Sequence, residues 1–314
     1  MKFKLSILLI ISAALVALFL FIDTGGNWEY ILPLRGRKIL AIILTGSAIG
    51  VSTIIFQTIT NNRILTPSVI GLDSLYMLIQ TMVVFLFGAD TLTMMNRNLH
   101  FLISVGFMML FALLLYRYLF KREGQNIYFL LLVGIILGTL FSSLSSFMEM
   151  LIDPNEFLVV QDSMFASFNN INTHLLMISC LFIICIGIYF VRYIKYLDVL
   201  SLGKHQAINL GIEYNAVIKR LLMIVAVFVS VSTALVGPIT FLGLLAANIT
   251  YQFLGTYKHK FLLPGSIFIS IIALFGGQLF VERIIHFSTT VSVIINLVGG
   301  CYFLYLLIRE NKSW

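Results

Sequence analysis

Charged residues are scarce in this chain: Lys, Arg, Asp and Glu make up 11% of its 314 residues, whereas hydrophobic residues make up 60%. A soluble domain carries about a quarter of its residues as charge, so a water-soluble fold would leave a very large apolar surface exposed. The mean hydropathy of +1.03 and room for ten spans of about 20 residues each instead predict an all-α, polytopic membrane protein. The alternating segments of about ten residues that build a membrane β-barrel are absent.

Patterns that carry chemistry are also missing. The three cysteines lie in apolar segments and lack the spacing of metal ligands or of a disulfide framework. No phosphate-binding loop, HExxH or GxSxG motif occurs, and the five histidines lie at span ends or in loops, where interfacial anchoring is expected. The net charge of +7 comes from basic residues that punctuate apolar stretches, which favours membrane lipid over nucleic acid as a partner. We therefore expect no enzymatic activity, no cofactor and no metal.

Ten apolar stretches are expected to cross the membrane within one transmembrane domain, residues 1–314. They are 5–22, 38–55, 69–88, 99–119, 127–151, 173–192, 217–236, 240–254, 262–281 and 292–308. The first has no signal-peptide cleavage site after it and is expected to remain as a helix. With this count, 15 of the 20 Lys and Arg residues lie on the side of the N-terminus. The positive-inside rule then places both termini in the cytoplasm.

Two connections on that side and one charge cluster on the other stand out. Residues 61–67 join the second and third spans around Pro67, and irregular backbone of this kind is tolerated near a membrane where it is buried or lines a cavity. Residues 193–216 form the longest connection, whose middle, 202–211, is expected to be a short amphipathic helix with Ala207, Ile208 and Gly211 towards one face. Residues 35–38 place basic side chains on the outer side, against the general bias.

Ionisable and hydroxyl residues inside the spans are functional candidates. Asp73 and Glu149 are the two carboxylates expected there. Each is either part of a proton relay or a group without a transport role that lies near the membrane interface. A serine-rich stripe at 142–146 is compatible either with a transport pathway or with close packing of helices. These alternatives stay open at the level of the sequence.

Four segments resemble the permease subunits of type II ABC importers for iron–siderophore complexes and vitamin B12. Residues 35–40 are similar to R-x-P-R-x-L, 57–71 to Q-x-x-T-x-N-P-L-A-x-P-x-x-x-G, 202–211 to L-G-x-x-x-A-x-x-L-G, and 236–244 to V-G-P-I-x-F-V-G-L. The chain departs from these patterns in that Arg37 and Arg63 replace prolines, Lys38 replaces an arginine, and Ala247–Asn248 replaces Pro-His. The motifs occur in order along almost the whole chain, and the siderophore branch is the better match.

The resemblance implies three groups of site residues. Docking of a substrate-binding protein is implied for Arg35, Lys38 and Arg283. Coupling to the ATPase is implied for Leu202, Gly203, Ala207, Leu210 and Gly211. The cytoplasmic gate or pathway is implied for Gln57, Asn62, Ile64, Pro67 and Gly71.

The resemblance also implies the partners: a second permease, identical or paralogous, two cytoplasmic ATPase subunits, and an extracellular or periplasmic substrate-binding lipoprotein. The expected function is import of an Fe(III)–siderophore complex at the expense of ATP hydrolysed by the ATPase subunits. Cobalamin or haem is the alternative cargo. The rival interpretation of the whole protein is a secondary transporter that uses Asp73 as its coupling carboxylate. The rival interpretation of the outer basic residues is that they anchor the chain to lipid headgroups.

Overall fold

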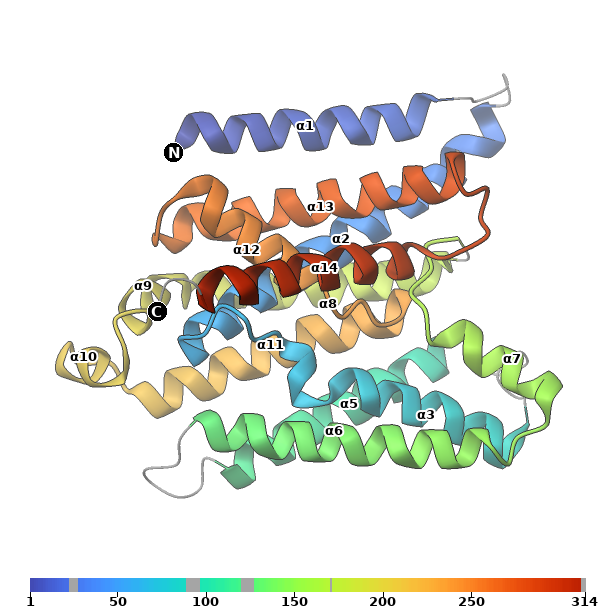
Figure 1. Cartoon of the computed structure of the whole chain (residues 1–314), viewed down its shortest axis with the longest axis horizontal. Helices are drawn as coiled ribbons and strands as arrows, with labels where there is room; N and C mark the ends of the chain where they lie inside the picture. Colours follow the sequence, from blue (N-terminus) through green and yellow to red (C-terminus); the bar gives the residue numbers. More distant parts are fainter. Residues whose placement is uncertain (23–27, 89–96, 120–126, 170, 312–314) are drawn as a thin grey trace.

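A computed structural model of the chain describes residues 1–22, 28–88, 97–119, 127–169 and 171–311. In these ranges the regular elements are helices, as expected for an all-α protein (Figure 1). They are α1 (Lys2–Phe21), α2 (Trp28–Thr60), η1 (Pro67–Ile70), α3 (Leu72–Phe87), α5 (Arg97–Leu119), α6 (Ile127–Glu149), α7 (Pro154–Ser163), α8 (Thr173–Val191), α9 (Ile194–Leu200), α10 (Lys204–Asn209), α11 (Tyr214–Val236), α12 (Leu242–Leu254), α13 (His259–Arg283) and α14 (Val291–Asn311).

The apolar helices correspond one to one with the ten expected spans. Among the described residues, seven helices are long and apolar enough to cross a membrane, and shorter apolar helices lie at the expected third, eighth and tenth spans, as α3, α12 and α14. The largest difference is α2, which is 33 residues long and begins ten residues before the expected span. Its basic residues at 35–38 therefore lie within a helix instead of marking its start.

The bundle has two distinct ends (Figure 1). Met1, the C-terminal end of α14 and the short helices α9 and α10 lie at one end, which we call the α10 end. Helix α7 and the C-terminal ends of α1 and α13 lie at the opposite end, which we call the α7 end. Met1 and the C-terminal end of α14 thus lie at the same end of the bundle, as an even number of spans requires.

Helix α7 lies outside the expected spans, although its start has a clear local signal. Asp153 is its N-cap and accepts a hydrogen bond from the backbone N–H of Asn155 at 2.9 Å, and Pro154 occupies the first helical position. An acidic cap followed by proline is a common helix start. The segment is too polar to be found by a search for apolar stretches.

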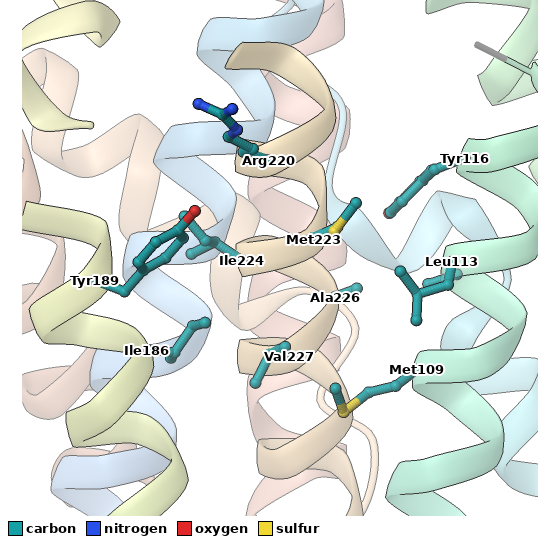
Figure 2. Close-up of a pocket in the computed structure, with 11 residues that line it drawn as sticks. Met109, Leu113, Tyr116, Ile186, Tyr189, Arg220, Met223, Ile224, Ala226 and Val227 are labelled. Carbon is teal, nitrogen blue, oxygen red and sulfur yellow. The ribbon is translucent and has the colours of Figure 1, made fainter. Parts of the chain in front are cut away.

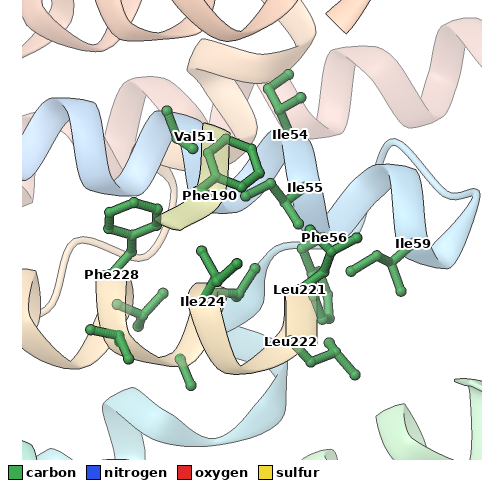
Figure 3. Close-up of a cluster of buried hydrophobic side chains, with 14 of the residues drawn as sticks. Val51, Ile54, Ile55, Phe56, Ile59, Phe190, Leu221, Leu222, Ile224 and Phe228 are labelled. Atoms are coloured by element: carbon green, nitrogen blue, oxygen red, sulfur yellow. The ribbon is translucent and has the colours of Figure 1, made fainter. Parts of the chain in front are cut away.

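Helix α11 runs through the centre of the bundle and is buried over most of its length. Its Leu221, Ile224 and Phe228 pack against α2, with Phe190 of α8 closing one side of the cluster (Figure 3). Lipid is as apolar as these side chains, so close packing, more than expulsion of water, holds such helices together inside a membrane.

A glycine pair fixes the position of η1 and α3 against α6. Gly134 and Gly138 are four residues apart on α6, and a Cβ at Gly134 would lie 2.9 Å from the Cα of Ile70. Gly71, between η1 and α3, has φ +87° and would bring a Cβ to 2.9 Å from the Cα of Gly138. Small residues at this spacing allow two backbones to approach closely in a membrane, and at Gly71 the positive φ also favours glycine.

Candidate functional site

The segment after α2 is held by short local hydrogen bonds. Asn61 adopts a positive φ of 48° and ends the helix. The Asn62 side chain then accepts a hydrogen bond from the backbone N–H of Ile64 at 2.9 Å, which forms a turn typical of asparagine. Asn62 and Ile64 are half-buried, whereas Gln57 is fully buried. Of the three predicted gate residues at this turn, Asn62 and Ile64 are therefore partly exposed and Gln57 is not.

The Arg63 carbonyl joins this turn to two helices. It accepts one hydrogen bond from Gln57 Nε2 of α2 at 2.6 Å and another from Asn248 Nδ2 of α12 at 3.0 Å. The Arg63 guanidinium lies over the rings of Tyr251 and Tyr257, 4.7 and 5.6 Å from their centroids, within the range of cation–π attraction. Arg63 and Asn248, two positions where the sequence departs from the resembled pattern, are therefore in direct contact.

The remaining predicted gate residues, Pro67 and Gly71, lie at the two ends of η1. Pro67 is buried at the first position of η1, after an extended Thr66. Gly71 ends η1 at the crossing with α6. The structure therefore divides the predicted gate into the Asn62 turn at the end of α2 and a tightly packed corner against α6.

The predicted coupling segment forms two short helices, α9 and α10. Gly203 and Gly211 flank α10 with φ values of +100° and +81°, a backbone conformation that glycine adopts without strain. Ala207 is fully buried against the protein, whereas Leu202 and Leu210 are 57% and 63% exposed.

The expected common face of Ala207, Ile208 and Gly211 is wrong, because Ile208 is 48% exposed and Gly211 is exposed as well, while Ala207 is buried. The small Ala207 side chain lets α10 lie close to α9 and α11. The large apolar side chains exposed on α10 and beside it are Leu202, Ile208 and Leu210.

A contact between helices at the α10 end was not anticipated from the sequence. Asp198 Oδ1 on α9 accepts hydrogen bonds from the backbone N–H and from Nδ1 of His259, at 2.8 and 2.7 Å. Nε2 of the same ring lies 2.7 Å from the hydroxyl of Thr58 on α2. Since His259 is 2% exposed, the interfacial anchoring expected for it is wrong. No sequence signal joins these residues, because 61 positions separate Asp198 from His259.

The Asp198 carboxyl is ionised in this contact. Its burial alone would raise its pKa, but the hydrogen bonds from His259 and the positive charge of Lys258 outweigh that effect and hold the pKa below its ordinary value. Asp198 also serves as a cap for α13 from another helix, because it accepts from the first N–H of α13 and complements the helix dipole. The sequence gives α13 no side-chain cap of its own at Lys258.

One cavity joins the predicted gate to the predicted coupling segment. Its volume is about 410 Å³, and its lining includes Gln57, Arg63, Leu202, Tyr257 and His259. The structure thus brings Leu202 of the coupling set and Gln57 of the gate set to the same space.

At the α7 end, two of the three predicted docking residues, Arg35 and Arg283, contact the C-terminus of α1. Arg35 Nη1 donates to the carbonyls of Phe19, Leu20 and Ile22 at 3.1, 2.9 and 2.6 Å. Arg283 Nη2 donates to the same Ile22 carbonyl at 3.3 Å. A basic side chain at a helix C-terminus satisfies carbonyls that have no partner within the helix.

Lys38 pairs with an acidic residue that the sequence analysis did not single out. Its Nζ lies 2.9 Å from Glu282 Oε1 and 3.1 Å from Asn169 Oδ1. Arg283, the neighbour of Glu282, is exposed, while Arg35 and Lys38 are half-buried. Arg283 is therefore the most accessible of the three predicted docking residues.

The two carboxylates expected inside spans are both held by hydroxyl groups. Asp73 lies in the first turn of α3 and accepts from Thr233 Oγ1 of α11 at 3.2 Å. Glu149 accepts from Ser145 at 2.9 Å, and Ser145 lies 2.7 Å from Thr81 of α3. Ser145 is buried by this packing, whereas Ser142, Ser143 and Ser146 remain exposed.

Metal-ligating side chains do not gather in the part of the chain that the structure describes: no group of three or more His, Cys, Asp or Glu is placed to hold an ion. The described cysteines, Cys180, Cys185 and Cys301, are free thiols.

Known proteins resemble this chain along its whole length. A model of the FecCD transport family matches residues 3–309. The petrobactin import system permease protein YclO of Bacillus subtilis (strain 168) is 62% identical over 313 residues, which cover 100% of this chain and 99% of the relative. The petrobactin import system permease protein FatC of Bacillus anthracis is 39% identical over 283 residues, with 89% and 80% covered.

A solved structure has the same fold. It is described as a metal-chelate type ABC transporter in an inward-facing conformation, and it superposes with a TM-score of 0.86 at 20% identity, covering 98% of this chain and 99% of the other. A likeness at this identity concerns the arrangement of the helices only.

Proposed function

This chain belongs to the FecCD transport family, and on that premise we propose that it is the membrane-spanning permease of an ABC importer for an Fe(III)–siderophore complex of the petrobactin class. The observation that carries the proposal is the 62% identity to a petrobactin permease over the full length of both chains. The 39% identity to a second petrobactin permease supports the same cargo. A hemin transport permease is 24% identical to this chain, which makes haem the weaker choice of cargo.

Transport in this proposal takes place between two permeases served by two ATPase subunits. The exposed serines of α6, Ser142, Ser143 and Ser146, lie on an otherwise apolar helix, and polar groups on such a surface are favourable where they meet water or a partner. We assign this face of α6 to the pathway. Ser145 belongs to the packing against α3, and Ser142 lies at the border of the two faces because it also donates to Ser74 of α3 at 3.1 Å.

The α10 end faces the cytoplasm in this proposal, and its short helices receive the ATPase. The excess of basic residues on the side of the termini supports this orientation. The exposed Leu202, Ile208 and Leu210 offer the ATPase an apolar contact, while the buried Ala207 holds α10 against the rest of the chain. ATP binding shifts the permease between two states only when these contacts differ between the states.

The contact of Asp198 with His259 and Thr58 supports a route from the ATPase to the gate. Asp198 is six residues before the start of α10, and Thr58 lies in the last turn of α2, directly before the Asn62 turn. Movement of α9 is therefore passed to the N-terminus of α13 and to the end of α2 through hydrogen bonds of 2.7–2.8 Å. Asp198, His259 and Thr58 are positioning residues in this proposal, because they act through the gate and do not touch the cargo.

Docking of a substrate-binding protein is assigned to the α7 end. Arg283 is exposed there, and charge-assisted pairs with carboxylates of the partner would orient it and speed association. Arg35 contributes by holding the C-terminus of α1 in place. Lys38 must exchange its pairing with Glu282 for any contact with the partner, so its contribution is the smallest of the three.

Uptake into membrane vesicles tests the proposed function. Vesicles that hold the permease pair and its ATPase should take up ⁵⁵Fe-petrobactin, delivered by the binding protein, only when ATP is on the ATPase side, and a protonophore should leave uptake unchanged. Unlabelled haem and cobalamin should not compete. Uptake driven by an ion gradient without ATP would refute the proposal, and competition by haem would overturn the cargo.

A further inference from the structure

An apolar groove runs between α5 and α8 over the surface of α11 (Figure 2). It encloses about 280 Å³ and is lined by Met109 and Leu113 of α5, Ile186 of α8, and Ala226 and Val227 of α11. Helices α5 and α8 both pack along α11 but have little contact with each other, so the space between them stays open. The groove lies away from the predicted gate and docking residues, and only its Arg220 contacts the start of the coupling segment, at Tyr193.

The groove opens towards the lipid. Leu113 and Tyr189, at its two edges, are 42% and 39% exposed. The neighbouring Leu110, Ile184 and Ile188 are 52%, 52% and 68% exposed on helices apolar enough to cross a membrane. A surface of this kind contacts acyl chains, and the groove is a recess in it.

The end of the groove nearest α10 is polar. Arg220 of α11 lies there and donates to Tyr193 Oη at 3.4 Å, a long bond that uses one of its five guanidinium donors. Tyr116 of α5 projects from the opposite wall (Figure 2). Its side chain is fully buried, and among the described residues no hydrogen-bond partner lies within reach of its hydroxyl. A buried hydroxyl without a partner is costly, which indicates a ligand with an acceptor.

Further positive charge surrounds this end. Arg192 caps α8 and acts electrostatically on Tyr189 and Tyr193. Arg117 lies exposed in the last turn of α5. Glu213, just before α11, also acts on Arg220 and would share the guanidinium with a bound anion. Three arginines against one carboxylate leave the mouth of the groove positive.

We propose that this groove binds an anionic phospholipid from the leaflet at the α10 end. One acyl chain occupies the apolar groove, an ester oxygen accepts from the Tyr116 hydroxyl, and the phosphate contacts Arg220 with support from Arg192 and Arg117. Basic pockets between membrane helices recognise anionic headgroups in this way. The proposal depends on the membrane topology and not on the cargo, so it stands or falls independently of siderophore transport.

Native mass spectrometry of the assembled transporter in detergent tests the site, with palmitoyl-oleoyl phosphatidylglycerol (POPG) and its phosphatidylcholine counterpart (POPC) added in steps. The wild type should retain one POPG per permease at a concentration at least fivefold below that needed for POPC, the factor expected for about one basic residue at the membrane surface. Arg220→Gln should remove most of this preference, Arg220→Lys should keep part of it, and Tyr116→Phe should weaken retention of both lipids.

Matched variants separate the groove from the general lipid shell. Ile186→Trp fills the groove and should abolish retention, whereas Ile184→Trp, two residues away on α8 and outside the groove lining, should not. Equal retention of POPC and POPG by the wild type, or equal effects of the two tryptophans, would overturn the proposal. So would a second protein chain cross-linked at residue 186, because the groove would then be a protein interface.

Discussion

Removal of the Asp198 carboxylate tests how the coupling segment acts on the gate. Asp198→Ala leaves the first N–H of α13 and the Nδ1–H of the buried His259 without their acceptor. An unsatisfied buried donor costs about 1–3 kcal/mol. Because Asp198 itself is half exposed, water will replace part of the loss, and we expect about 2 kcal/mol for the link as a whole. This corresponds to a factor of about 30 in an equilibrium constant.

The assay is the number of siderophore complexes imported per ATP hydrolysed by the reconstituted transporter. If Asp198 transmits movement, Asp198→Ala should lower this ratio several-fold while ATP hydrolysis continues. Asp198→Asn keeps an oxygen acceptor at the same position and should lie between the wild type and the alanine variant. Glu213→Gln is the matched control, since it removes an exposed carboxylate from the same connection without touching His259.

A lower melting temperature with an unchanged transport ratio would refute the reasoning, because Asp198 would then only stabilise the fold. The pH dependence gives a second check. The pKa of Asp198 is depressed in the folded protein by the hydrogen bonds from His259 and the charge of Lys258, although burial opposes them. A depressed carboxyl contributes stability above its unfolded-state pKa and loses it as the pH falls through the lower folded-state pKa. The link should therefore persist at neutral pH and fail only in acid, and the alanine variant should lack that acid-dependent step.

Three further predictions follow from other contacts. Gly138→Leu should prevent stable folding or lower the melting temperature strongly, because its Cβ would lie 3.1 Å from the Cα of Gly71; Gly187→Leu, which meets no atom within 4 Å, should not, as fluorescence-detected size exclusion after heating will show. Asp73→Asn should leave ATP-driven uptake insensitive to protonophores and within about threefold of the wild type, whereas complete loss of uptake in a folded variant would revive the ion-coupled alternative. Arg283→Gln should weaken association with the binding protein at low salt and reduce its salt dependence, measured by biolayer interferometry; an unchanged salt dependence would return Arg283 to a role at the end of α1.

The number and order of the membrane helices follow from the sequence, because an apolar stretch of the right length has few other ways to fold in lipid. The residue at which α2 begins does not follow from the sequence. A rule that ends helices at charged residues places it near Lys38, whereas the helix runs from Trp28. Its basic side chains are accommodated by the carbonyls at the end of α1 and by Glu282, and contacts so distant in sequence leave no periodic signal.

The candidate sites show the same division. Local sequence predicts the turns at the glycines on either side of α10 and the irregular backbone near Pro67. Both features depend on the backbone preferences of a few consecutive residues. The direction of Ala207 depends on what lies beneath α10, and the partner of His259 is 61 residues away. The resemblance to a known family predicted which residues serve docking, coupling and gating, but it did not predict which other residues they contact.

The Arg63 turn explains why a departure from the resembled pattern fits here. Proline and arginine both provide a carbonyl at this position, and it is the carbonyl that Gln57 and Asn248 bind. What arginine adds is a guanidinium stacked on Tyr251 and Tyr257, which replaces the stiffness of a proline ring with an attraction between the turn, α12 and the segment that follows it. Asn248, the second departure, supplies an amide N–H directed at that carbonyl. Arg63 and Asn248 thus contribute to one structural element, a turn hydrogen-bonded to both α2 and α12, and for this reason the turn can respond as a unit when the end of α2 is moved.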